Sequence, residues 1–198
     1  MHQTSKAGTT RLNILNKAFA LVYKNGYQAT SIDEIIATTQ VTKGALYYHF
    51  KNKDEMGLAI IREVMYPAMH ATMVAPLIDT KDPQNEIYRM MKAVLNDESF
   101  FNIQYGCPAV NLIGEMAPSN VHFATALKKL IEEWKGTIVT SLEAAKKMQT
   151  VRSDVDSEQV AIFVLSGYSG IRNLGKLLGK SCYATYLKEL KDYLKTIK

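Results

Sequence analysis

VTKGALYYHFKNKDE, at residues 41–55, decides how the fold of this chain is interpreted. Three apolar residues, Val41, Leu46 and Phe50, are spaced for burial in a core. Beside them lie two adjacent tyrosines, a histidine and three lysines, which favour contact with a polar partner. The stretch is therefore predicted to be half buried and half exposed.

Two short helices are predicted on either side of a tight turn. Ser31 and Glu34 form an S-x-x-E capping box, in which the serine caps a backbone N–H and the glutamate reaches back. This helix is expected to end near Thr38, and Thr42 can cap the next one. Only residues 39–41 separate the two helices, which is the spacing of a helix-turn-helix.

The second of these helices is expected from Thr42 to about residue 49, with Leu46 facing inward and Phe50 packed at its end. The residues left on its outer faces are Lys43, Gly44, Ala45, Tyr47 and Tyr48. This face suits the major groove of DNA, because small residues permit close approach while long polar ones reach bases and phosphates. The alternative is a solvated amphipathic helix whose tyrosines only pack, and these residues alone leave both interpretations open.

Helical periodicity recurs along all 198 residues with almost no period-two alternation, so the chain is predicted to be all-α, with about nine helices. The first helix is expected at about 10–25, and a later one runs from Asn52 toward Pro67. After a linker near 74–82, helices are expected from Asp82-Pro83, from Pro108, from Ser119, at about 157–178 and at about 182–197.

Composition and charge narrow the classes of protein. An apolar content of 47% can form one sizeable core or two small ones, and the net charge of +5 allows nucleic acid without requiring it. Residues 1–64 hold eight Lys or Arg against five Asp or Glu, so the first third is the more basic. Because no stretch of 18 apolar residues and no secretory signal is present, no membrane contact is expected and the predicted location is the cytoplasm. His49 and the two cysteines lack ligand spacing, so neither a metal nor a cofactor is predicted.

Several motifs together resemble one family. T-R-x-x-I-L stands at residues 10–15, N-G-Y-x-A-T-S-I-D-E-I at 25–35 and V-T-K-G-A-L-Y-Y-H-F-K-N-K-D-E at 41–55. Over roughly residues 9–60 the chain thus closely resembles the DNA-binding domain of TetR-family transcriptional regulators. The resemblance implies a helix-turn-helix domain at 1–56 and a larger helical domain for ligand binding and dimerisation at 57–198.

The resemblance also implies residue roles. Lys43, Gly44, Ala45 and Tyr47 match groove-facing positions, and Thr30, Tyr48, His49 and Lys53 match positions that contact phosphates; Ser31 and Thr42 complete the predicted DNA-binding set. Ile36 and Thr39 stand where small alanines are common in the family, and Gln40 stands where the turn usually has glycine. We expect Gln40 to adopt a left-handed conformation, which costs a non-glycine residue energy.

Methionines and aromatics gather between residues 65 and 134, where adaptable side chains can line a pocket for an apolar ligand. The predicted ligand-binding residues are Met69, Met90, Phe101, Tyr105, Cys107, Asn111, Glu115 and Trp134. Ordinary core packing is the alternative for each apolar member, and Asn111 and Glu115 could equally face solvent. Cys107 precedes Pro108 and is predicted at a helix N-cap, where the helix dipole lowers a thiol pKa; an inert buried cysteine is the alternative.

The last two helices are predicted to form a dimer interface. Ser166, Gly167 and Gly170 leave a shallow strip where another helix can approach. The remaining predicted interface residues are Ile162, Phe163, Leu174, Tyr186, Leu190, Tyr193 and Leu194, although packing within the chain could absorb these stripes.

The expected function is a homodimeric transcriptional repressor, released from a palindromic DNA operator by a small hydrophobic effector. An activator remains possible on these residues. The other classes are an architectural DNA-binding protein without an effector and a redox- or electrophile-sensing regulator acting through Cys107. An enzyme is not expected, because His70 and His122 form no recognisable arrangement with that cysteine.

Overall fold

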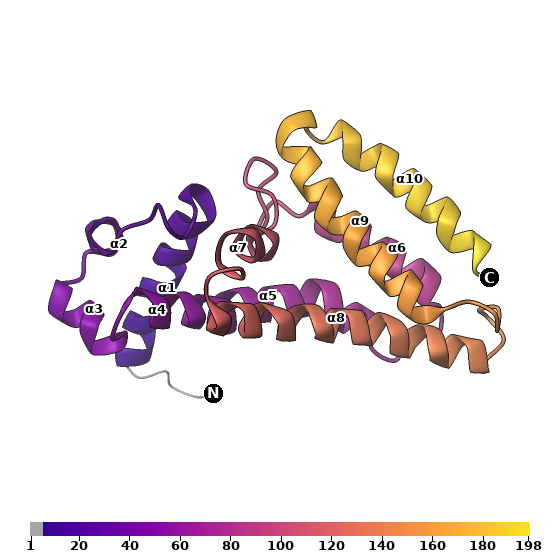
Figure 1. Cartoon of the computed structure of the whole chain (residues 1–198), viewed down its shortest axis with the longest axis horizontal. Coiled ribbons are helices and arrows are strands. Elements are labelled where there is room, and N and C mark those ends of the chain that lie inside the picture. Colours follow the sequence, from indigo (N-terminus) through magenta and orange to yellow (C-terminus); the bar gives the residue numbers. More distant parts are fainter. Residues whose placement is uncertain (1–5) are drawn as a thin grey trace. The chain divides into compact units, whose positions relative to one another are not determined.

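A computed structural model of the chain describes residues 6–198, and these residues form helices, turns and loops with no strand (Figure 1). The all-α prediction is confirmed. The chain falls into two compact units, one built from the chain up to Pro67 together with Asn111–Lys128, the other from Ala68–Val110 and Lys129–Lys198. The first unit therefore includes residues 111–128, which the predicted division between residues 56 and 57 assigns to the second domain.

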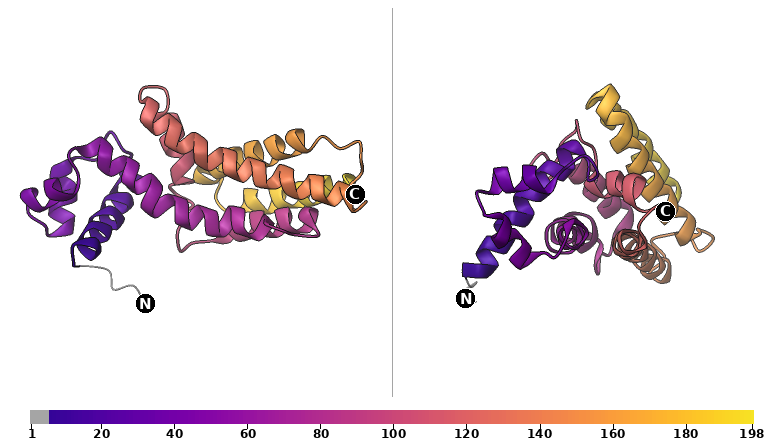
Figure 2. Two further views of the ribbon diagram at one scale, coloured as in Figure 1. Left: turned by 90° about the horizontal axis from the view of Figure 1, so that it is seen from below. Right: turned by 60° about the vertical axis from the view of Figure 1, so that its left-hand side comes forward.

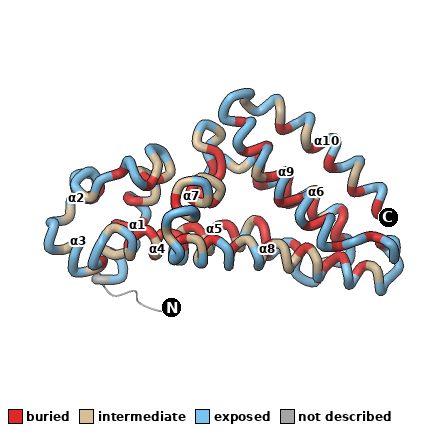
Figure 3. Tube along the Cα trace, in the orientation of Figure 1, coloured by how far each residue is buried: buried red, intermediate tan, exposed pale blue. Residues whose placement is uncertain are grey.

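The first unit is built around α1 (Lys6–Asn25), which contacts α2 (Ile32–Thr39) and α4 (Lys53–Ile60). The helix α1 begins about one turn earlier than its apolar stripe indicated. The core of the first unit combines residues from α1, α2 and α4 with residues from α3 (Lys43–His49) and its end. Its fully buried apolar residues include Ile14, Leu15, Ala18, Ile35, Leu46, Phe50 and Ala59. Figure 3 shows the resulting alternation of buried and exposed positions along the helices.

The turn between α2 and α3 follows from local sequence chemistry. The Ser31 side chain accepts a hydrogen bond from the backbone N–H of Glu34, and the Glu34 carboxylate accepts one from the backbone N–H of Ser31. Gln40 ends α2 in the left-handed region with φ of 58°, and Thr42 caps α3 by accepting from the Ala45 N–H. The predicted capping box, left-handed turn and third helix are thus confirmed.

The predicted end of the following helix near Pro67 is wrong. Helical segments succeed one another through α4, the π-helical turn η1 (Ile61–Met65), α5 (Tyr66–Met69), the π-helical turn η2 (His70–Val74) and the 3₁₀ turn η3 (Ala75–Leu77). Pro67 lacks a backbone N–H and therefore removes one hydrogen bond from the helix. The wide π turn η1 precedes this proline, and such turns are one way in which helices accommodate irregular hydrogen bonding. The linker is correspondingly shorter than the predicted 74–82.

The second unit holds α6 (Pro83–Asn96), α9 (Ser157–Leu178) and α10 (Ser181–Thr196), and α10 packs on both others (Figures 1 and 2). Asp82 caps α6 with Pro83 in its first turn, and α9 has its predicted bounds. α7 (Pro108–Met116) begins at the predicted proline. The helix expected from Ser119 is α8 (Val121–Lys147), which begins two residues later because the side-chain oxygen of Asn120 accepts from the N–H groups of its first turn.

None of the helices among residues 6–198 is both long and apolar enough to cross a membrane.

Candidate nucleic-acid interface

The outer face of α3 carries an unusual exposure of aromatic and basic side chains. Leu46 and Phe50 are fully buried, whereas Tyr48 is 81% exposed and Tyr47 43% exposed. Lys43 is also exposed and lies 3.6 Å from Asp33 in an exposed ion pair, which contributes little to stability and is easily exchanged for another anion. The helix is thus anchored by one face and presents the other to solvent.

The start of this face is open to close approach. Gly44 has no atom near the position that a Cβ would occupy, and Ala45 has only a methyl side chain. Exposed Ser31 and Thr42 lie at the N-termini of α2 and α3, where backbone N–H groups and the helix dipole favour anions. The sequence-predicted residues from Ser31 to Tyr48 are therefore brought together on two consecutive helices.

Arg11 holds the C-terminal end of α3 in place, a role that the predicted site did not include. Its guanidinium donates to the backbone oxygen of His49 at 3.0 Å and lies 4.4 Å above the ring of Phe50. It also pairs with Glu63 at 2.6 Å. The signal was present in the sequence, because Arg11 belongs to the T-R-x-x-I-L motif, but its partners are 38 and 52 residues away.

Two predicted phosphate contacts are engaged within the chain. Thr30 is fully buried and its hydroxyl donates to the backbone oxygen of Gly26 at 2.7 Å, so the predicted side-chain contact is corrected to a structural role. Lys53 donates to the backbone oxygen of Gln28 at 3.3 Å and lies 4.5 Å above the ring of Tyr27. Burial lowers the pKa of Lys53, while nearby Glu115 and Asp54 act in the opposite direction. Its ammonium must leave these partners to reach a phosphate.

Glu115 lies in the same cluster and clamps the turn between α1 and α2. Its carboxylate accepts hydrogen bonds from the backbone N–H groups of Tyr27 at 2.9 Å and Gln28 at 2.6 Å. Gly26, with φ of +93°, makes the left-handed turn that precedes these two N–H groups. The prediction that Glu115 orients a ligand is therefore corrected, because both carboxylate oxygens bind backbone N–H groups of the first unit.

Further contacts surround this clamp. The Tyr27 hydroxyl donates to Asp54 at 2.6 Å, and Asn120 donates to the other oxygen of the same carboxylate at 3.0 Å. Burial, followed by the bond to Asp54, raises the pKa of Tyr27. The rings of Tyr27 and Phe123 meet edge to face at 4.9 Å, directly beside Gly57. α4 and the start of α8 are thereby tied to the turn between α1 and α2.

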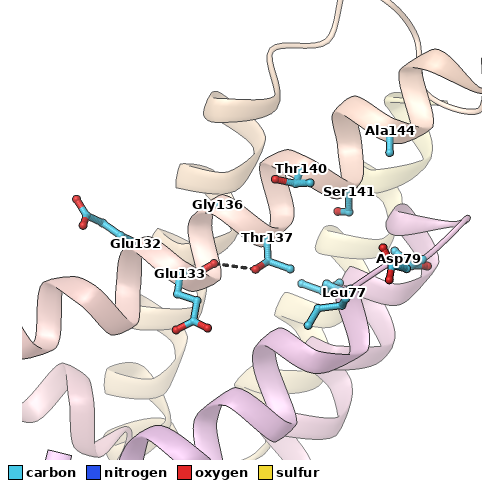
Figure 4. A pocket seen from close by; sticks show the side chains of 11 residues that line it. Leu77, Asp79, Glu132, Glu133, Gly136, Thr137, Thr140, Ser141 and Ala144 are labelled. Atoms are coloured by element: carbon cyan, nitrogen blue, oxygen red, sulfur yellow. Dashed lines mark hydrogen bonds between the residues drawn. The ribbon is translucent and has the colours of Figure 1, made fainter. Parts of the chain in front are cut away.

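The second unit contains a groove that none of the predicted ligand residues lines. Its volume is about 360 Å³, and Figure 4 shows it between α8 and the loop after η3. The lining consists of Leu77, Ile78, Asp79, Thr80, Glu132, Glu133, Gly136, Thr137, Thr140, Ser141 and Ala144. Three of these residues are carboxylates and none is Lys, Arg or His, so the groove disfavours an anion.

The predicted ligand residues are distributed over both units. Asn111 and Glu115 belong to the first unit, and the others to the second. Met69, Met90, Phe101, Cys107 and Trp134 are buried, and Tyr105 is partly exposed. Cys107 immediately precedes α7, as predicted, but only 1% of it is exposed. A reactive thiol needs access as well as a favourable helix terminus, so the geometry weakens the sensor interpretation.

The predicted dimer residues fall into two groups. Ile162 and Phe163 are 52% and 46% exposed, and Ser166, Gly170 and Leu174 are exposed on the same helix. Leu190 and Leu194 are instead buried within the chain, on the stripe of α10 that packs against α6 and α9. Their predicted place in an interface is corrected, because a helical stripe does not reveal whether its partner belongs to the same chain.

The remaining predicted dimer residues lie at contacts between α9 and α10. A Cβ on Gly167 would lie 2.5 Å from the hydroxyl of Tyr186, so the glycine permits these helices to approach. Tyr193 is partly exposed and packs 4.3 Å from the Phe163 ring. Leu177 and Leu178 extend the exposed apolar face of α9 at its C-terminal end.

Comparisons with known proteins agree on one family. Residues 14–60 match the family described as bacterial regulatory proteins, tetR family, and residues 83–189 match the tetracyclin repressor-like C-terminal domain. An uncharacterised HTH-type transcriptional regulator of Lactococcus lactis is 30% identical over 68% of this chain and 69% of its own length. The HTH-type transcriptional repressor DhaR of a Mycobacterium species is 21% identical over 81% of this chain and 79% of its own length. A TetR-family regulator from Cytophaga hutchinsonii has the same fold, with a TM-score of 0.88 at 20% identity over 100% of this chain and 98% of that one.

Proposed function

We propose a function from the premise that this chain belongs to the TetR family of bacterial transcriptional regulators, which are DNA-binding proteins and not enzymes. The chain acts as a homodimeric repressor in the cytoplasm. It binds a palindromic operator through α2 and α3 of each subunit. A small effector bound by the C-terminal domain lowers its affinity for that operator. The predicted division into a DNA-binding domain at 1–56 and an effector and dimerisation domain at 57–198 is part of this proposal.

The DNA-binding part of the proposal is supported by the two faces of α3, one buried and the other exposed. Burial of Leu46 and Phe50 orients the helix, and Lys43, Gly44 and Tyr48 then face solvent together. Lysine can donate to guanine O6 and N7, and the Tyr47 ring can contact a thymine methyl. We place Tyr48 and His49 beside phosphates, with Ser31 and Thr42 at the helix starts. Because α3 holds no arginine, DNA shape contributes to specificity.

The exposed apolar face of α9 supports dimerisation. Ile162, Phe163, Leu174, Leu177 and Leu178 are each about half exposed or more. Covering an apolar side chain contributes about 25 cal/mol per Å² removed from water, so a second copy of this face is a favourable partner. A two-fold dimer places its DNA-binding helices on half-sites about 34–36 Å apart or a multiple of that distance.

DNA binding is tested by selecting bound duplexes from a random pool and measuring affinity for the winning site. We expect a palindrome, and Lys43→Ala should cost about 1–3 kcal/mol for each base contact that it removes. Tyr48→Phe should weaken binding across sequences by removing the phenolic donor. Lys92→Ala removes the same charge from an exposed site on α6 and serves as the control. Equal affinity for all duplexes would instead favour an architectural protein.

Dimerisation is tested by sedimentation of Phe163→Glu. A charge within the apolar face should produce monomers and abolish operator binding while leaving helicity unchanged. Lys92→Glu introduces the same side chain elsewhere and should remain dimeric. A Phe163→Glu variant that still sediments as a dimer would place the interface on another surface.

The alternative of a thiol sensor is tested by alkylation at neutral pH. Because Cys107 is buried, we expect iodoacetamide to modify Cys107 far more slowly than partly exposed Cys182. Rapid alkylation of Cys107 with loss of operator binding would favour the sensor.

A further inference from the structure

The interior of the second unit holds a buried cation that interacts electrostatically with the Asp97 carboxylate at the end of α6 without forming an ion pair. Arg172 of α9 is 1% exposed, and it forms no ion pair with any carboxylate among residues 6–198. Its single hydrogen bond runs from one terminal guanidinium nitrogen to the backbone oxygen of Val94 at 2.7 Å, in the last turn of α6. Charged groups are almost never fully buried unless they are paired. This guanidinium is therefore only partly compensated.

Three aromatic rings surround the guanidinium and contact it through their faces. Its central carbon lies 4.4 Å from the ring centre of Phe101, 5.6 Å from that of Tyr168 and 5.9 Å from that of Tyr183. Such contacts favour a cation, but they leave its Nε–H without a hydrogen-bond acceptor. Burial opposes the charge, while the two tyrosine hydroxyls hold the pKa of Arg172 above its ordinary value.

Four polar atoms around this centre are buried and have no hydrogen-bond partner in the described chain. They are Nε of Arg172, the hydroxyls of Tyr168 and Tyr183, and Nε1 of Trp134, whose ring meets Tyr168 edge to face at 5.3 Å. Buried polar atoms in native proteins are nearly always satisfied, so four unsatisfied atoms in one cluster require a cause. Each of the four can donate, and the arginine and indole nitrogens cannot accept.

We infer that this cluster is an anion site, and that the effector carries a negatively charged oxygen group, a carboxylate, on an apolar body. That the bound anion acts as an effector rests on the proposed function, whereas the presence of the anion site does not. A carboxylate supplies two oxygens that can each accept more than one hydrogen bond, together with a negative charge that can pair directly with Arg172. Phe101 and Trp134 then contact the apolar part.

The surroundings favour the entry of an anion from the side of α9. Lys176 is exposed one turn beyond Arg172, and its Cε lies against Gly106, at the position that a Cβ would occupy. The flexible cationic side chain of Lys176 therefore lies over the turn that precedes Cys107, next to the backbone oxygen of Arg172. The groove on α8 shares no residue with this cluster and is lined by carboxylates, so it does not compete for the same ligand.

The chain offers its own reporter for a test. Trp134 is its one tryptophan, so the intrinsic fluorescence excited at 295 nm originates within the cluster. Protein free of DNA is titrated with formate, acetate, hexanoate, octanoate and benzoate, and with the matching neutral amides. We expect at least one carboxylate to change the fluorescence saturably and to raise the melting temperature, and its amide to bind at least tenfold more weakly.

Three variants separate an anion site from a merely structural arginine. Arg172→Met should lose at least tenfold in carboxylate affinity, since it removes the charge and keeps much of the volume. Tyr168→Phe removes one hydroxyl at constant shape and should lose about three- to tenfold. Arg152→Met makes the same change at an exposed arginine and should bind as the unaltered protein does. The Tyr168→Phe result keeps the test decisive if Arg172→Met does not fold.

The inference is overturned if no carboxylate in the series binds, if the amides bind equally well, or if Tyr168→Phe binds unchanged. Operator binding is measured separately. A protein that binds its operator but no carboxylate retains the proposed function and loses the anion site. A protein that binds carboxylates with Arg172 dependence but shows no operator binding retains the site and loses the proposed function.

Discussion

Replacement of Glu115 by alanine should loosen the turn between α1 and α2. The change removes two hydrogen bonds in which a carboxylate accepts from the backbone N–H groups of Tyr27 and Gln28, at 2.9 and 2.6 Å. Hydrogen bonds to charged groups contribute about 1.5–3 kcal/mol each. Because Gln28 is exposed and water can replace its bond, we expect a total loss of about 2–3 kcal/mol.

The free energy of unfolding is measured by urea denaturation followed by circular dichroism, together with hydrogen exchange of the two amides. Glu115→Gln retains one acceptor oxygen without the charge, so it should lose about half as much stability. Glu189→Ala removes an exposed carboxylate from α10 and is the matched control. If Glu115→Ala unfolds within 0.5 kcal/mol of the unaltered chain, roughly the uncertainty of a neutral surface change, the clamp does not stabilise this unit.

Three further outcomes are expected. Gln40→Gly should stabilise the chain by about 0.5–1 kcal/mol in urea denaturation, because φ is 58° there, and Gln40→Ala, which keeps a Cβ, should not. Gly57→Ala should destabilise it by about 1–3 kcal/mol, since the new methyl carbon would lie 2.6 Å from the rings of Phe123 and Tyr27; unchanged stability would mean that these rings move freely. Burial raises the pKa of Tyr186 to about 12, so the folded form keeps the phenol proton that the unfolded form loses near pH 10. Its contribution is complete below pH 10 and is lost as the pH rises toward 12, and Tyr186→Phe should therefore weaken the fall of stability in that window, measured by chemical denaturation at each pH.

The helices α2 and α3 illustrate what local sequence can determine. Ser31 with Glu34, Gln40 and Thr42 act on backbone groups within four residues, so their capping and turn roles are present in the order of the residues. The same holds for the outer face of α3, since the period of a helix places Leu46 and Tyr48 on different sides. These features need no knowledge of distant segments.

The tertiary structure decided which partners the remaining side chains have. Leu190 and Phe163 both belong to apolar stripes, but only packing of α10 on α6 and α9 buries the first and leaves the second exposed. Glu115 was a plausible ligand residue until the fold placed it against backbone N–H groups 87 and 88 residues away. In the sequence Arg172 is a charged position on a helix, and only the fold buries it among Phe101, Tyr168 and Tyr183 with its Nε unpartnered. Periodicity and capping act over one or two turns and are therefore encoded locally, whereas burial and charge pairing join residues far apart in the chain and arise only when the helices pack.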